Sequence, residues 1–81
     1  MVGGVIILGM RLRELRAKKL LTVRELARQS GTSEDGLYRI ERGQWLPSLT
    51  TVRKLSATLN VDPEEVEEFK AAIDKAARRG S

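Results

Sequence analysis

The sequence has no cysteine and no histidine among its 81 residues. Without cysteine no disulfide bond can form, and without either residue the common zinc-ligand sets are excluded. Catalysis by a nucleophile that is activated by an imidazole is excluded for the same reason. The remaining classes are a small binding module, an enzyme that works with carboxylates alone, and a structural piece of a larger assembly.

Aromatic residues and long apolar runs are also scarce. One Trp, one Tyr and one Phe make up the aromatic content, so the core is expected to be aliphatic. The longest apolar run, residues 5–8, is far shorter than the ~20 residues that a membrane-spanning helix needs. With 41% hydrophobic and 32% charged residues, the chain has the composition of one small globular domain. We expect a cytoplasmic protein without a membrane segment.

The basic residues are concentrated in the first half of the chain. The 15 Lys and Arg exceed the 11 Asp and Glu and give a net charge of +4. Residues 1–31 hold seven basic and two acidic residues, whereas residues 60–81 hold four basic and six acidic ones. A surface that binds a polyanion is therefore expected to draw on the first half.

A short helix over residues 23–30 has the clearest boundaries. Thr22 and Glu25 have the spacing of a capping box, in which each side chain accepts a hydrogen bond from the backbone amide of the other residue. Gly31 supplies the left-handed residue that ends such a helix. A second N-cap residue, Ser33, follows within three residues of the helix end, so the next helix must cross the first at a steep angle.

The same kinds of signal predict three further helices. Ser48 caps one of them after Pro47, which disfavours helix at the residue before it. Asp62 at the cap and Pro63 at the first helical position begin the last one. Strand-like alternation is missing outside residues 5–8, so we predict an all-α fold with one aliphatic core. The five helices are expected at residues 10–19, 23–30, 34–42, 48–59 and 63–78.

Six short motifs follow one another between residues 10 and 69. They are Leu12-Arg-Glu-Leu-Arg16, Leu21-Thr-Val-Arg-Glu-Leu-Ala27, Gly31-Thr-Ser33, Leu37-Tyr-Arg-Ile-Glu-Arg-Gly43, Pro47-Ser48 and Leu55-Ser-Ala-Thr-Leu-Asn-Val61. In this order and spacing they resemble the helix-turn-helix domain of the Cro and phage-repressor superfamily, often called the Xre type. The resemblance implies a compact five-helix, lambda-repressor-like domain over residues 10–69, with double-stranded DNA as its partner.

The resemblance also implies which residues meet DNA. The helix from Ser33 to Arg42 would lie in the major groove, and the helix before it would cross the backbone. Arg39 is the leading base reader, because an arginine can donate two hydrogen bonds to one guanine. The implied base-edge residues are Ser33, Glu34, Asp35, Tyr38 and Arg39. The implied phosphate-binding residues are Thr22, Val23, Arg24, Arg42, Gly43, Gln44 and Trp45.

Two carboxylates depart from the family pattern. Glu34 and Asp35 begin the helix that would read bases, where only a cytosine amino group would accept a carboxylate directly. They can also simply stabilise the positive end of the helix dipole, and both interpretations stay open. Val23 stands where a polar phosphate ligand is frequent in the family, and the loop at Gln44 lacks a basic residue. We therefore expect a modest salt dependence of DNA binding.

Four other features complete the expectations. The resemblance implies a partly buried structural ion pair between Arg16 and Glu41, which would fix how the DNA-reading helix is presented. Gly36, inside that helix, indicates a close backbone approach to DNA or to another helix, and Trp45 would either buttress its loop or stack on DNA. Residues 1–9 are a packing arm, a dimer contact, or sequence upstream of a natural start at Met10. Residues 70–81 would hold the end of the last helix, a candidate dimer surface, and a tail.

The sequence thus predicts sequence-specific binding of double-stranded DNA by a prokaryotic or phage transcriptional regulator, with a homodimer on a palindromic site as one arrangement. The alternative is an antitoxin or a protein-interaction module on the same fold, with weak or no DNA binding and a toxin or regulator as partner. No catalytic residue, cofactor or metal is expected, because the adjacent acids Glu34 and Asp35 point at different angles from a helix.

Overall fold

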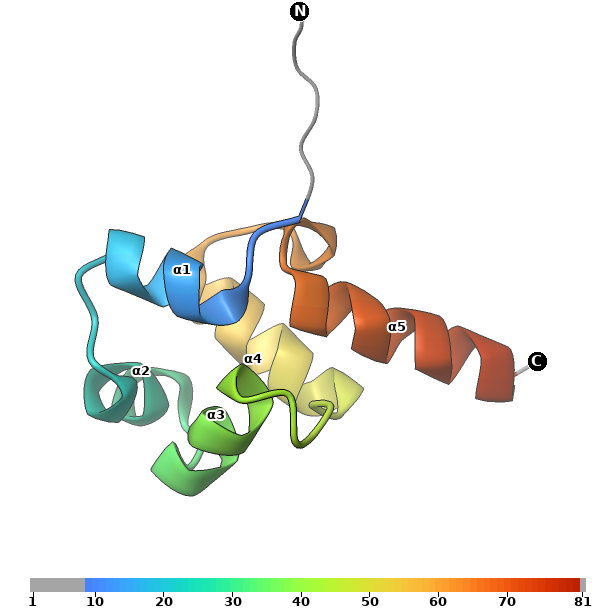
Figure 1. Ribbon diagram of the computed structural model, residues 1–81, viewed down its shortest axis with the longest axis horizontal. Helices are drawn as coiled ribbons and strands as arrows, with labels where there is room; N and C mark the ends of the chain where they lie inside the picture. The colour runs from blue at the N-terminus through green and yellow to red at the C-terminus, as the bar shows by residue number, and fades with distance from the viewer. Residues whose placement is uncertain (1–8, 81) are drawn as a thin grey trace, which may run out of the picture.

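The computed structural model describes residues 9–80, which form five α-helices and one short 3₁₀ helix (Figure 1). The elements are α1 (Leu12–Lys18), α2 (Val23–Ser30), α3 (Glu34–Glu41), α4 (Leu49–Leu59), η1 (Pro63–Glu65) and α5 (Glu67–Gly80). This part of the chain contains no strand, so the predicted all-α class with five helices is confirmed. Within residues 9–80 no helix has the length and apolar character needed to cross a membrane. The interpretations of residues 1–9 fall outside the described residues, except for Gly9.

Local signals decide where the three middle helices begin. At α2, the Thr22 hydroxyl accepts from the Glu25 amide at 3.0 Å and the Glu25 carboxylate accepts from the Thr22 amide at 2.8 Å. The bond from the Thr22 amide is the main reason why the pKa of Glu25 is lowered. Ser33 caps α3 and Ser48 caps α4, each by accepting an amide three residues on. The predicted capping box and both serine caps are confirmed.

The bounds of the first and last helices differ from the prediction because the residues just before α1 and α5 pair with each other. Met10 is not helical: its amide donates to the Glu65 carbonyl at 2.7 Å, and its carbonyl accepts from the Glu67 amide at 2.9 Å. These bonds form an isolated parallel bridge between Met10 and Val66 and hold Val66 extended, with φ −113° and ψ 123°. Consequently α1 begins at Leu12, and the single helix expected over 63–78 is divided into η1 and an α5 that continues to Gly80.

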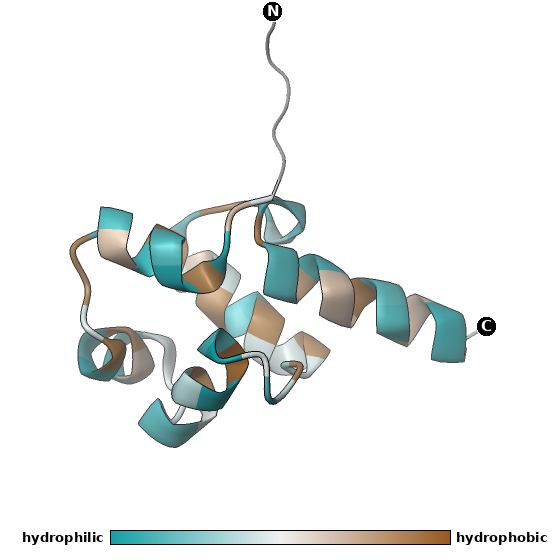
Figure 2. Ribbon diagram, viewed as in Figure 1, coloured by the Kyte–Doolittle hydropathy of each residue, from teal (hydrophilic) through white to brown (hydrophobic). Residues whose placement is uncertain are grey.

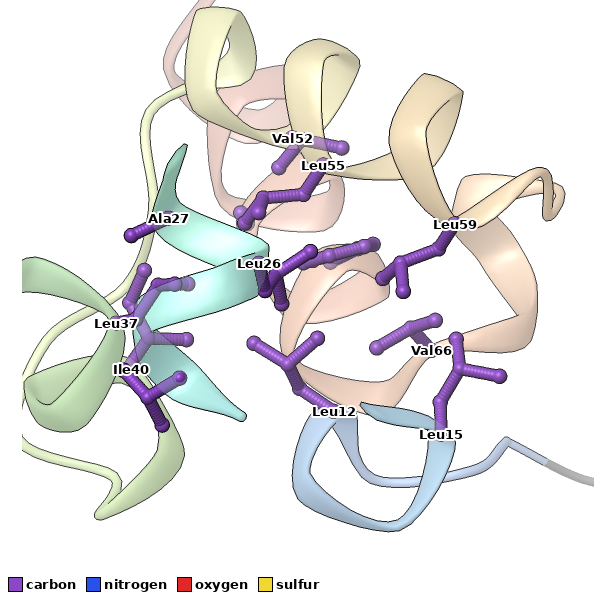
Figure 3. Packing of buried hydrophobic residues seen from close by; sticks show 13 residues of the cluster. Leu12, Leu15, Leu26, Ala27, Leu37, Ile40, Val52, Leu55, Leu59 and Val66 are labelled. Atoms are coloured by element: carbon purple, nitrogen blue, oxygen red, sulfur yellow. The ribbon is translucent and has the colours of Figure 1, made fainter. Parts of the chain in front are cut away.

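The core is built around α2. Leu26 is fully buried and lies between Leu37 and Ile40 of α3 on one side and Leu12 of α1 on the other (Figure 3). Most hydrophobic residues of the helices lie on the sides that face the other helices, with hydrophilic residues on the outer sides (Figure 2), although Leu49 at the start of α4 stays 46% exposed. Burying each large aliphatic side chain contributes about 1.5–3 kcal/mol. The buried apolar residues are Leu12, Leu15, Val23, Leu26, Ala27, Leu37, Ile40, Val52, Leu55, Leu59, Val66, Phe69 and Ala72.

The end of α1 contains a backbone conformation that its residue does not favour. Leu20 has φ 60°, in the left-handed region, and its side chain is 89% exposed. The Leu20 amide donates to the Ala17 carbonyl at 2.9 Å and the Leu21 amide to the Arg16 carbonyl at 3.1 Å, which is the bonding pattern of a Schellman motif. Gly31, Gly43 and Asn60 hold the left-handed positions after the next three helices. Leu20 is therefore the strained member of this set.

We predict that Leu20→Gly raises the free energy of unfolding by about 0.5–1 kcal/mol. Glycine adopts a positive φ without the clash of a Cβ atom, and little packing is lost from a side chain that is almost wholly exposed. Urea denaturation measures the change. Leu20→Ala is the matched control, because it removes the apolar surface but keeps the Cβ atom, and it should give no gain. Equal stabilisation by both variants would show that backbone strain is not the cause.

Candidate nucleic-acid interface

Helices α2 and α3 lie side by side at the end of the molecule opposite to η1 (Figure 1). The turn between them holds Gly31 at φ 73° and the cap residue Ser33. Leu37 and Ile40 anchor α3 in the core, with exposed fractions of 1% each. Because α3 is held by this one face, its other face is left to solvent. The candidate base-edge residues Ser33, Glu34, Asp35, Tyr38 and Arg39 are all exposed.

Both carboxylates at the start of α3 are paired with arginines. Asp35 Oδ2 accepts from Arg39 Nε at 2.9 Å, one helical turn along α3. Glu34 Oε2 lies 3.5 Å from Arg24 Nε, on α2. Both pairs are exposed, so each contributes little to stability. Their effect is on charge, since neither carboxylate faces outward without a cation beside it.

The first turn of α2 offers one charged side chain to a phosphate. Val23 is buried, with 5% of its surface exposed, so only its backbone is available to a ligand. The Thr22 amide already donates to the Glu25 carboxylate. The Arg24 side chain is 83% exposed. Of Thr22, Val23 and Arg24, it is the residue that can present a positive charge to a phosphate.

Arg28 is a residue that the sequence-based assignment missed. It is exposed on α2 and lines a shallow hollow together with Arg24, Thr32 and Glu34. Arg24 and Arg28 are four residues apart on one helix, and that spacing places both on the same face. The spacing was readable from the sequence and adds a second cation beside the turn.

The loop after α3 presents its residues next to the helix start. Gly43 has φ 75°, its amide donates to the Ile40 carbonyl at 3.1 Å, and the Gln44 amide donates to the Arg39 carbonyl at 2.9 Å. Arg42 places its guanidinium 5.7 Å from the centre of the Tyr38 ring. A hollow of about 310 Å³ joins the loop to α3. It is lined by Ser33, Asp35, Gly36, Arg39, Gln44 and Trp45.

Gly36 is explained by Trp45. A Cβ atom on Gly36 would lie 3.0 Å from Cζ3 of the Trp45 indole and 2.8 Å from the hydroxyl of the cap residue Ser33. The indole therefore packs against the bare backbone of α3, while 52% of Trp45 stays exposed. Within the protein, the close approach at Gly36 is made by the loop residue Trp45 and not by the other helix that the sequence suggested.

Arg16 and Glu41 form a partly buried ion pair, as the resemblance implied. Arg16 Nε donates to Glu41 Oε2 at 2.7 Å and Nη2 to Oε1 at 3.0 Å, a bidentate arrangement. Arg16 Nη1 also donates to the Leu21 carbonyl at 2.9 Å. The two side chains are only 16% and 6% exposed, and the hydrogen bonds with Glu41 raise the pKa of Arg16.

The described part of the chain shows no arrangement suited to a metal. Within residues 9–80, no three His, Cys, Asp or Glu side chains gather closely enough to hold an ion. The polar groups of the α2–α3 face are instead guanidinium, hydroxyl, amide and paired carboxylate groups. Such groups recognise phosphates and base edges by hydrogen bonds.

We predict that Arg16→Ala lowers the free energy of unfolding by about 2–4 kcal/mol, because Glu41 is left buried without a partner and the Leu21 carbonyl loses a donor. Urea denaturation measures this loss without screening the charges. The matched control is Arg39→Ala, which breaks an exposed pair and should change stability by less than about 0.5 kcal/mol. A similar, small effect of both variants would contradict a structural role for Arg16.

Known proteins resemble the chain over the segment that carries this site. The family described as a helix-turn-helix domain matches residues 7–69. The HTH-type transcriptional repressor RghR of Bacillus subtilis (strain 168) is 42% identical over 57 residues, which are 69% of this chain and 42% of that protein. An uncharacterized HTH-type transcriptional regulator of Archaeoglobus fulgidus is 34% identical over 56 residues, which are 69% of this chain and 80% of that protein. No solved structure matches the chain.

The aligned region covers 42% of the length of RghR and also of a second Bacillus subtilis relative, the uncharacterized HTH-type transcriptional regulator RghRB. The likeness to these proteins therefore concerns one domain of each. In this chain the matched segment, residues 7–69, contains the capped α2, the left-handed turn and the exposed face of α3. With a match over residues 7–69, the chain belongs to the helix-turn-helix domain family, in agreement with its resemblance to the Xre type.

Proposed function

We propose that this chain is a transcriptional regulator that binds double-stranded DNA sequence-specifically and inserts the segment from Ser33 to Arg42 into the major groove. The observation that carries the proposal is the placement of α3, which is anchored by Leu37 and Ile40 and exposes its polar face. A helix that is held along one side can enter the major groove with the other. The residues 10–69 would form the DNA-binding domain.

The charges around α3 support the same partner. Arg24 and Arg28 flank the start of α3, and Arg42 lies at its end. These cations, with the Thr22 side chain, the Val23 backbone amide and the loop residues Gly43, Gln44 and Trp45, would contact phosphates on either side of the groove. Ser33, Tyr38 and Arg39 would face base edges, with Arg39 donating to a guanine.

An antitoxin or protein-interaction module without DNA binding is not favoured. Glu34 and Asp35 would favour the protein-interaction module if their carboxylates were unpaired, because carboxylates repel phosphates. Because Glu34 lies beside Arg24 and Asp35 beside Arg39, each negative charge is offset locally. The pairs remove the main reason to expect that DNA is rejected.

The names of the relatives indicate the kind of regulation. RghR is named a transcriptional repressor, and the other matched proteins are named transcriptional regulators. We propose repression by occupancy of an operator, in the cytoplasm of a prokaryotic or phage-infected cell. Two copies on a palindromic operator would place their α3 helices in half-sites about 34 Å apart.

The proposal predicts that selection from a pool of randomised duplexes enriches a defined sequence. Binding should weaken as salt rises from about 50 to 200 mM, because phosphate contacts release counterions. Arg39→Ala should cost about 1–3 kcal/mol at one base pair of the selected site, measured by fluorescence anisotropy with base-substituted duplexes. The matched control is Arg79→Ala, which removes an equal charge from the last turn of α5 and should leave the base preference unchanged.

Selection of no sequence at low salt would overturn the proposed function. Enrichment that survives unchanged in Arg39→Ala would instead leave DNA binding in place and remove Arg39 from base reading.

A further inference from the structure

We infer that Asp35 is a positioning residue for DNA recognition. Its carboxylate holds the Arg39 guanidinium in the orientation that reads a guanine, and Asp35 thereby contributes to base specificity. Repulsion of phosphates is not its main effect. The inference rests on the proposed function and assigns a role to a residue that departs from the family pattern. It is carried by the hydrogen bond from Arg39 Nε to Asp35 Oδ2, at 2.9 Å.

The atom that makes this bond matters. A guanidinium has one N–H on Nε and two on each terminal nitrogen, in one plane. Because the Nε–H group of Arg39 donates its hydrogen bond to Asp35, both terminal nitrogens remain available at the far end of the guanidinium. A guanine offers two acceptors, O6 and N7, along its major-groove edge, which match two parallel N–H groups. The contact with Asp35 thus leaves the guanine-reading end free.

The pair lies on the face of α3 that would meet the major groove. Asp35 and Arg39 are one turn apart on the exposed face, and their side chains are 78% and 58% exposed. Arg39 also lines the hollow that α3 shares with the loop residues Gln44 and Trp45. An arginine on such a surface would otherwise sample many rotamers, and ordering it in advance reduces the entropy lost on binding.

The neighbouring carboxylate cannot do the same. Glu34 pairs with Arg24, on α2, at 3.5 Å. The two acids have the same charge and adjacent positions in the first turn of α3, where both stabilise the helix dipole. They differ in the arginine that they contact, and only Asp35 contacts one on the base-reading face. This difference separates positioning from simple charge or helix capping.

The contact between Asp35 and Arg39 should be stronger in the DNA complex than in the free protein, because water weakens it in the free protein. In water an exposed pair of this spacing contributes little to folding. When DNA excludes water from the groove, the same contact operates in a lower dielectric and becomes stronger. Asp35→Ala should therefore keep the fold, with only the small drop in thermal midpoint that the loss of a first-turn carboxylate causes, and its main effect should appear in base discrimination.

The experiment uses the duplex that the wild-type protein selects and the base pair at which Arg39→Ala loses discrimination. Discrimination is the ratio of Kd values for the substituted and the selected duplex, measured by fluorescence anisotropy. We expect Asp35→Ala to lower this ratio at that base pair at least about fivefold, while its affinity for unrelated duplexes rises because a negative charge is gone. In the double variant with Arg39→Ala, Asp35→Ala should cause no further loss of discrimination, because both substitutions remove the same contact between Asp35 and Arg39.

Two variants sharpen the result. Glu34→Ala removes the same charge from the adjacent position and should raise affinity for unrelated duplexes while leaving the discrimination ratio unchanged. Asp35→Asn keeps an oxygen acceptor of the same reach without the charge, and it should retain most of the discrimination.

Equal discrimination by Asp35→Ala and the wild type would overturn the inference and leave the proposed function intact. An equal loss in Glu34→Ala, or a wild-type site at which Arg39→Ala changes nothing, would overturn it as well. If the wild-type protein selects no duplex at low salt, both the proposed function and this inference fail.

Discussion

The ion pair of Arg16 with Glu41 adds a fixed geometry to the core contacts of Leu37 and Ile40 that hold α3 in place. The Arg16 guanidinium donates two hydrogen bonds to Glu41 at the end of α3 and one to the Leu21 carbonyl just before α2. A single planar group with fixed donor directions therefore sets α1, the entry to α2 and the end of α3 relative to one another. The pair is nearly buried, so its geometry is coupled to the core formed by Leu12 and Ile40. The exposed face of α3 is oriented as a consequence.

Ion pairs at two levels of burial have different roles in this small domain. The buried pair of Arg16 and Glu41 is costly to break, because either partner alone would be an uncompensated charge. The pair of Arg24 with Glu34 is exposed, so it can be exchanged for contacts with a ligand at small cost, whereas the exposed pair of Arg39 with Asp35 would be kept in the complex that we propose. Under the proposed function, stability and recognition would rely on separate sets of arginines, and the second set could vary without loss of the fold.

The sequence predicted those parts of the structure that local interactions determine. The bounds of α2 and its capping box were correct, as was the serine cap of α3, because each depends on residues within one helical turn. The bridge between Met10 and Val66 joins segments 56 residues apart and has no local signal, and it shortened α1 and divided the last helix. In the site, the pairing of Glu34 with Arg24 depends on how two helices cross and was not predictable. The pairing of Asp35 with Arg39 has a readable four-residue spacing that was not used.

The contact between Trp45 and Gly36 joins the two halves of the interface. A glycine inside α3 costs about 1 kcal/mol relative to alanine. In return the indole packs directly on the helix backbone, and the loop that carries Gly43 and Gln44 is held against the first turn of α3. Phosphate contacts fix the register of a protein on DNA, and base contacts then read the sequence at that register. Because Trp45 connects the loop with the helix start, a shift of one would move the other. If the loop binds phosphates and α3 reads bases as proposed, the missing side chain at Gly36 lets both act from one rigid frame.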